Sequence, residues 1–117
     1  MWFVFPQLLG LGHSPTAQFY ALASIEEAEA YLRDPTLGAR LRQCTLLVNE
    51  IQGRAIGEIF GHPDDLKFHS CMTLFARVAA LGEAAVSKEN QVFRDAIEHY
   101  FGGREDPRSL ALLGQQE

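Results

Sequence analysis

The chain has 117 residues, of which 47% are hydrophobic and 21% are charged, and its formal net charge at pH 7 is −5. This length and composition are typical of one globular domain that buries its own core, which excludes a disordered protein. The excess of acidic over basic residues also argues against a nucleic-acid or anionic-membrane surface, because such surfaces depend on clustered Lys and Arg.

The N-terminal segment begins with four consecutive apolar residues, Trp2 to Phe5. This run is far shorter than the roughly 20 residues of a membrane span and lacks the basic flank of a signal peptide. We therefore expect a cytoplasmic protein. Further along, Ser14-Pro15 has the pattern of a helix cap followed by proline at the first helical position, which predicts a short helix through Leu22.

Two further helix starts follow. Ser24 with Glu27 three residues later is a capping box. Asp34-Pro35 repeats the cap-and-proline pattern and predicts a longer helix that Gly53 ends. The apolar residues of this helix recur at intervals of four and three, as on one face of an α-helix. They are Leu37, Leu41, Cys44, Val48 and Ile51. We expect this helix to be a central element of the core, with Leu41 and Val48 almost fully buried.

The middle of the chain predicts a short helical turn and a long helix. Residues 54–60 form the turn, which Gly61 closes, and His62-Pro63-Asp64 opens the next helix. The apolar stripe of that helix repeats with helical spacing. It consists of Phe68, Met72, Phe75 and Ala79.

The last third of the chain predicts a loop and two more helices. The loop covers residues 80–90, and the amphipathic helix after it ends at Gly102-Gly103. Asp106-Pro107 then caps a short final helix. No run alternates with a period of two for long enough to indicate a strand. The sequence therefore predicts an all-α fold, a single compact domain of five to seven short helices over residues 1–117.

Several blocks of the sequence, in the same order, resemble those of a known family. They run from Trp2 to Gly12, from Glu27 to Leu41, from Ile59 to Phe75 and from Phe101 to Leu110. Together they resemble the bacterial domain of unknown function eighteen-ten. The resemblance implies a mainly helical fold and brings no established activity. Members of that family usually carry a further helix before the Trp-Phe block, so we expect residues 1–117 to lack an N-terminal helix present in the family.

The densest group of reactive side chains lies between Asp64 and Phe75. On a helix, Lys67, Ser70 and Leu74 share one face with Thr73 beside them, because residues three and four apart are neighbours. A lysine one turn from a hydroxyl would activate that hydroxyl or hold a small anion. The alternative is an exposed helix face, with Asp64 and Asp65 simply favouring the positive helix N-terminus.

A second candidate position is the turn at His13-Ser14, which follows Gly10-Leu11-Gly12 and opens a helix. Backbone N–H groups there would receive an anion, whereas a solvated turn histidine is the alternative. Trp2 is either a stacking surface or part of the core. The candidate ligand-binding residues are therefore Trp2, His13, Ser14, Asp65, Lys67, Ser70 and Thr73.

The histidines and cysteines indicate neither a metal nor a cofactor. His13, His62, His69 and His99 lack metal-ligand spacing. Cys44 and Cys71 fall on predicted apolar faces, which favours buried thiols over a disulfide or a nucleophile.

Two hypotheses for the function follow. In the first, the protein binds or hydrolyses a small anionic, nucleotide-like metabolite in a pocket around Asp65, Lys67, Ser70 and Thr73. In the second, it is a non-enzymatic helical module for protein interaction, and these residues only fix the fold. The apolar N-terminal segment also predicts a partner. Without a covering helix, the exposed side chains of Trp2, Phe3 and Phe5 favour contact with a second copy of the chain, which would form a homodimer.

Overall fold

The computed structural model describes residues 5–7, 21–22, 24–80 and 88–116. Its elements are α2 (Ile25–Arg33), α3 (Leu37–Asn49), α4 (Ile56–Phe60), α5 (Asp64–Ala79), η2 (Lys88–Asn90, a 3₁₀ helix), α6 (Gln91–Phe101) and α7 (Pro107–Gln116). No β-strand occurs in these described ranges, so the predicted all-α fold is confirmed. The short helix expected from Ser14 falls largely on residues 14–20, outside the described ranges.

Side-chain caps start the helices where the sequence predicted them. The Ser24 hydroxyl accepts the Glu27 N–H at 3.2 Å and so starts α2. The Asp34 carboxylate accepts the N–H groups of Thr36 and Leu37 at 2.9 and 2.8 Å, at the start of α3. Each cap satisfies N–H groups that have no partner within the helix.

Glycines in the left-handed region end two of the helices. Gly61 follows α4 with a φ of 76°, and Gly102 follows α6 with a φ of 63°. The helix expected from Leu37 to Ile51 is α3, which begins at Leu37 as predicted and ends slightly earlier, at Asn49. The Tyr100 hydroxyl donates to the carbonyl oxygens of Val48 and Ile51 at this end, so α6 holds the chain where it leaves the helix.

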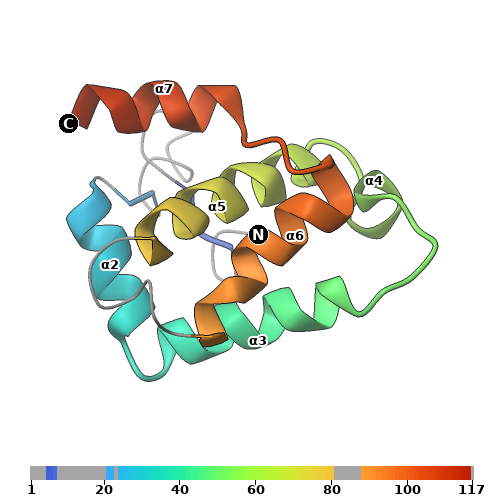
Figure 1. Ribbon diagram of the computed structural model, residues 1–117, viewed down its shortest axis with the longest axis horizontal. Coiled ribbons are helices and arrows are strands. Elements are labelled where there is room, and N and C mark those ends of the chain that lie inside the picture. Colours follow the sequence, from blue (N-terminus) through green and yellow to red (C-terminus); the bar gives the residue numbers. More distant parts are fainter. Residues whose placement is uncertain (1–4, 8–20, 23, 81–87, 117) are drawn as a thin grey trace.

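The centre of the molecule is α5, which packs against α2, α4, α6 and α7 (Figure 1). Every residue from Ser70 to Ala76 is buried, so this part of the helix is enclosed on all sides. The predicted core helix α3 packs against α2 and α6. Its apolar stripe is buried as predicted, with Leu41 0% and Val48 8% exposed.

Aromatic rings fill the core around Phe68, which is fully buried. Phe5 packs edge-on against Phe60 and Phe68, with ring centroids 5.7 and 5.1 Å apart. Phe5 is 4% exposed within its own chain. Trp2 and Phe3 lie outside the described residues, so the homodimer through these three residues stays a prediction.

Within the described part of the chain, no helix is both long and apolar enough to cross a membrane. The longest, α5, has 16 residues, and about 20 apolar residues are needed for a span.

Candidate functional site

Ser70 and Thr73 form hydrogen bonds at the start of α7. The Ser70 hydroxyl lies 3.0 Å from the carbonyl oxygen of Leu66 and 3.1 Å from Asp106 Oδ2. The Thr73 hydroxyl donates to the carbonyl oxygen of His69 and accepts the Asp106 N–H, both at 2.9 Å. Both hydroxyls are buried and have partners. The structure therefore gives them a part in packing two helices together.

Asp106 is the centre of this polar cluster because it also caps α7. Its Oδ2 accepts the Ser109 N–H at 3.0 Å and the Ser109 hydroxyl at 2.6 Å. Ser109 is fully buried. The cap that the sequence predicted at Asp106-Pro107 is thus present, and two hydroxyls of α5 hold it in position.

The other described candidates turn toward their own neighbours in sequence. Lys67 Nζ lies 3.6 Å from Asp64 Oδ1, one helical turn away. Asp65 Oδ1 accepts His62 Nδ1 at 3.1 Å and the Leu66 N–H at 2.9 Å. The four-residue block predicted to line one pocket therefore does not converge. Trp2, His13 and Ser14 lie outside the described residues.

A polar stripe along α5 holds the linker between α6 and α7. The stripe is His69, Thr73 and Arg77, spaced four residues apart on one helix face. His69 Nε2 donates to the carbonyl oxygen of Arg104 at 2.7 Å, and its ring stacks on Phe101 with centroids 3.8 Å apart. The four-residue spacing was visible in the sequence, but the residues that these side chains contact were not.

The carboxylate of Glu105, in that linker, accepts hydrogen bonds from two guanidinium groups. Arg77 Nε donates to Glu105 Oε2 at 2.7 Å, and Arg94 Nη1 donates to Glu105 Oε1 at 3.2 Å. Burial by itself raises the pKa of Glu105, but the hydrogen bonds and charges of both arginines outweigh it and lower that pKa below its usual value. The carboxylate is therefore ionised at neutral pH, and the group of three carries a net charge of +1.

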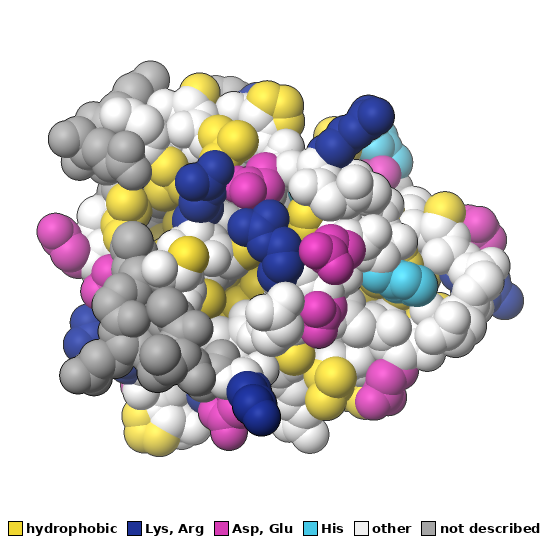
Figure 2. All heavy atoms as spheres, in the orientation of Figure 1, with side chains coloured by type: hydrophobic (Ala, Val, Ile, Leu, Met, Phe, Trp, Pro, Cys, Tyr) yellow, Lys and Arg dark blue, Asp and Glu magenta, His cyan; other side chains and the backbone are white. Residues whose placement is uncertain are grey.

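One face of the molecule exposes charged side chains of both signs next to apolar atoms. Figure 2 shows Lys or Arg side chains beside Asp or Glu side chains over the middle of the molecule, with hydrophobic atoms bordering them. Arg77 is the more exposed of the two arginines, with 53% of its side chain accessible, whereas 17% of the Glu105 side chain is accessible.

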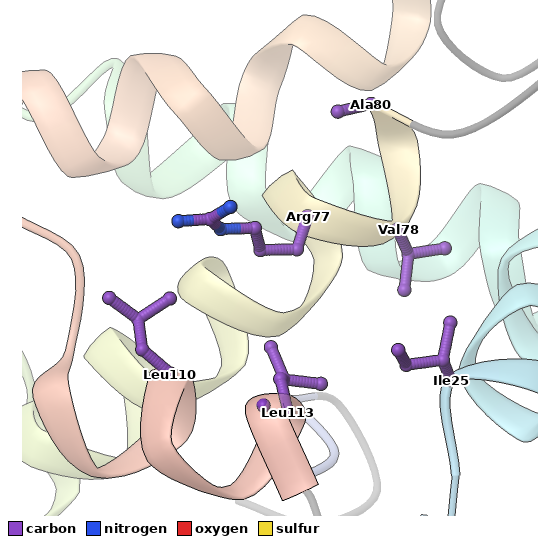
Figure 3. Close-up of a pocket in the computed structure, with 7 residues that line it drawn as sticks. Ile25, Arg77, Val78, Ala80, Leu110 and Leu113 are labelled. Carbon is purple, nitrogen blue, oxygen red and sulfur yellow. The ribbon is translucent and has the colours of Figure 1, made fainter. Parts of the chain in front are cut away.

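A cavity of about 260 Å³ lies beside Arg77, between the start of α2, the end of α5 and α7. Its lining residues are Ile25, Arg77, Val78, Ala80, Leu110, Leu113 and Gly114. In Figure 3 the Arg77 guanidinium lies on the Leu110 side of this space, away from Ile25. The walls are therefore apolar, with one cationic group at the edge.

The sequence alone did not indicate this cavity. Its lining residues come from three segments far apart in the chain, and most are ordinary aliphatic residues. No residue predicted for the site lines it. The nearest signal was Arg77 itself, an arginine on a helix whose other residues from Ser70 to Ala79 are all buried.

Metal and thiol chemistry have little basis in the described residues. No group of three or more His, Cys, Asp or Glu residues there is arranged to hold a metal ion. Burial raises the pKa of the Cys71 thiol well above its usual value, so the reactive thiolate does not form at neutral pH. Cys44, which is half-buried, is also a free thiol.

Comparison with known proteins identifies the family. The chain is similar to the conserved hypothetical protein Rv1873 from Mycobacterium tuberculosis, whose crystal structure shares 55% sequence identity and a TM-score of 0.86. That match covers 97% of this chain and 75% of the other. A comparison with curated proteins finds no match. The model of the family described as "Protein of unknown function (DUF1810)" matches residues 1–113, which confirms the resemblance of the sequence blocks. The chain therefore belongs to the DUF1810 family.

Proposed function

We propose that this protein binds a small anionic molecule in the cavity between α2, α5 and α7. The apolar part of the ligand occupies the cavity, and its anionic group lies at the guanidinium of Arg77. The observation that carries this proposal is an apolar cavity of about 260 Å³ with a cationic group at its edge. Ligand pockets in proteins combine apolar walls with a few polar groups that fix orientation in this way.

The contacts of Arg77 support its role as the anion-binding group. Its hydrogen bond to Glu105 uses Nε, and its two terminal nitrogens form no hydrogen bond with any described residue. Arg94 shares Glu105, so one carboxylate compensates two guanidinium groups. The positive charge that results attracts an anion, and the side chain is exposed enough to meet one.

The cavity walls favour binding over hydrolysis. Six of the seven lining residues are aliphatic or glycine, and Arg77 is the exception. Acid–base or nucleophilic catalysis requires a titrating or nucleophilic group within hydrogen-bond reach of the substrate, and an arginine does not titrate near neutral pH. The proposed activity is therefore non-covalent binding.

Gly114 provides a sharp test, because a Cβ built on it meets no atom within 4 Å. Gly114 lines the cavity, so we expect the larger side chain of Gly114→Leu to occupy part of it. The substitution also replaces glycine by a better helix former inside α7. We expect the variant to be as stable as the wild type or more stable, and to lose ligand binding. Gly114→Ala is the matched control, since it improves helix propensity but adds a single methyl group.

The measurement is a thermal-shift and calorimetric screen of small organic anions against the wild type and each variant. Arg77→Gln should lose binding while Arg33→Gln, which removes an exposed arginine of α2, should retain it. Anions that bind equally well to wild type and Gly114→Leu would place the ligand elsewhere and reject the proposal.

A non-enzymatic interaction module is the second candidate. Leu46 and Leu47 are adjacent on α3 with 48% and 57% exposure, so two large apolar side chains lie together at the surface. Replacing both leucines with serine should abolish the binding of a protein partner in a pull-down from the native cell without lowering the stability of the chain. A partner retained by this double variant would reject an α3 interface.

We further propose that this binding takes place in the cytoplasm. Cys44 and Cys71 are both free thiols, as expected in a reducing compartment. Fractionation of the native cell with an antibody against the protein would test this location.

A further inference from the structure

We infer that the ligand of the α2–α5–α7 cavity is a monocarboxylate with a compact apolar body, and that Glu105 selects for its single negative charge. This inference rests on the proposed function of the same site. It replaces the nucleotide-like metabolite expected from the sequence with a different class of anion. Size, wall chemistry and charge each support it independently.

The size of the cavity sets the size of the apolar body. A protein cavity of about 150 Å³ with Leu, Ile and Phe walls binds benzene. At about 260 Å³, the cavity here accommodates one ring or a short branched chain with a few further atoms. A nucleoside monophosphate, with base, sugar and phosphate, exceeds this space.

The walls disfavour a polar body. Arg77 contributes the one polar side chain among the seven lining residues. Hydroxyl groups of a sugar or amide groups of a base would lose their water partners on entering and gain none from the Ile25, Val78, Leu110 and Leu113 side chains. An aliphatic or aromatic body has no such groups to leave unpaired.

The terminal nitrogens of Arg77 match a carboxylate. A guanidinium presents two parallel N–H groups in one plane, which is the arrangement that a carboxylate accepts with both oxygens. Glu105 already holds the Nε side of the same guanidinium at 2.7 Å and so fixes the plane of the group. The ligand carboxylate would complete the arrangement on the opposite side.

Glu105 limits the charge that the site accepts. Arg77, Arg94 and Glu105 together carry +1, so one ligand carboxylate brings the local charge to zero. A second negative charge on the ligand would exceed the +1 of this group and leave it with a net negative charge. Like charges repel each other, most strongly in a partly buried site.

Three probes of similar shape and different charge test the inference at about pH 8, where phenyl phosphate is a dianion. Phenylacetate has one negative charge, phenyl phosphate has two, and 2-phenylacetamide is neutral. In calorimetric titrations of the wild-type chain, we expect phenylacetate to bind at least about tenfold more tightly than either of the others. Adenosine monophosphate should not bind.

Substitution at Glu105 then tests its role in selectivity. Glu105→Gln raises the local charge to +2. The affinity for phenyl phosphate should therefore rise about tenfold or more, so that phenyl phosphate binds at least as tightly as phenylacetate. Arg94→Gln, which does not alter the cavity lining, should weaken the binding of both phenylacetate and phenyl phosphate. If Glu105→Gln does not fold, the order of affinities in the wild type and in Arg94→Gln still decides the question.

The outcomes separate this inference from the proposed function. Tighter wild-type binding of phenyl phosphate or adenosine monophosphate, abolished by Gly114→Leu, would overturn the monocarboxylate and leave the cavity as the binding site. Phenylacetate binding that Gly114→Leu does not affect would overturn both. If none of the probes binds the wild type, the assignment of a monocarboxylate is also wrong.

Discussion

Leu41 shows at the scale of one residue how the sequence periodicity becomes stability. It lies on the apolar stripe of α3 and is 0% exposed. Leu41→Ala should lower the free energy of unfolding by about 2–5 kcal/mol, because it removes buried methyl groups and leaves a cavity. Urea denaturation gives this value. Leu47→Ala on the exposed face of the same helix is the control and should stay within about 0.5 kcal/mol of the wild type.

Glu105 links the arginine cluster to the pH dependence of stability. Its pKa in the folded protein is below the ordinary value of 4.5, so the folded state favours the ionised form. The stabilisation is complete above that ordinary value and is lost as the pH falls through the lowered folded-state pKa. The wild type should therefore lose stability on acidification.

Glu105→Gln should lose less stability than the wild type between about pH 7 and about pH 3, as measured by urea unfolding. Some acid sensitivity should persist in the variant, because backbone N–H groups of Leu37 and Thr36 lower the pKa of Asp34 as well. Equal pH dependence in the two proteins would contradict the role of the two arginines at Glu105.

At the scale of elements, α7 depends on α5 for its position. Few of its side chains are buried, chiefly Ser109 and Leu113. Polar contacts from Ser70, Thr73 and Arg77 hold the linker that leads into it. The position of α7 therefore rests on hydrogen bonds at its N-terminus as much as on apolar packing, and α7 forms one wall of the cavity.

Asp106→Ala should loosen α7 and lower the free energy of unfolding by about 1–3 kcal/mol. The variant removes an N-cap and also leaves the buried Ser70 and Ser109 hydroxyls without their shared acceptor. Hydrogen exchange of the α7 amides should become faster. Asp34→Ala, which removes the corresponding carboxylate at the start of α3, is the control and should leave exchange in α7 unchanged.

At the scale of the whole molecule, self-association remains a prediction from the sequence. Four consecutive apolar residues cannot all face one core, and burying each large side chain favours association by about 1.5–3 kcal/mol. Since Phe5 is buried within its own chain, Phe3 is the residue at which the proposed homodimer is tested. Light scattering should detect a species near twice the 13.0 kDa chain mass.

Phe3→Asp should dissociate that dimer without unfolding the chain. Phe5→Asp is the contrasting variant, because it places a carboxylate between Phe60 and Phe68 and should unfold the protein. A wild-type chain that stays monomeric at high concentration would exclude the dimer.

The sequence by itself determined the helices and most of their ends, because these depend on local chemistry. Ser24 and Asp34 bind N–H groups two or three residues away, and Gly61 and Gly102 take backbone conformations that other residues disfavour. Such signals need no knowledge of the rest of the chain. The contact of Tyr100 with the end of α3, about fifty residues away in the chain, could not be predicted from local signals.

The tertiary structure decided what the polar residues of α5 do. Ser70 and Thr73 looked like a site because three-residue spacing placed them on one face, but their common partner, Asp106, lies more than thirty residues further along the chain. The cavity likewise joins side chains from α2, α5 and α7. A local pattern shows which side chains share a helix face. Only the packing of distant segments shows whether that face meets solvent, a ligand or another helix.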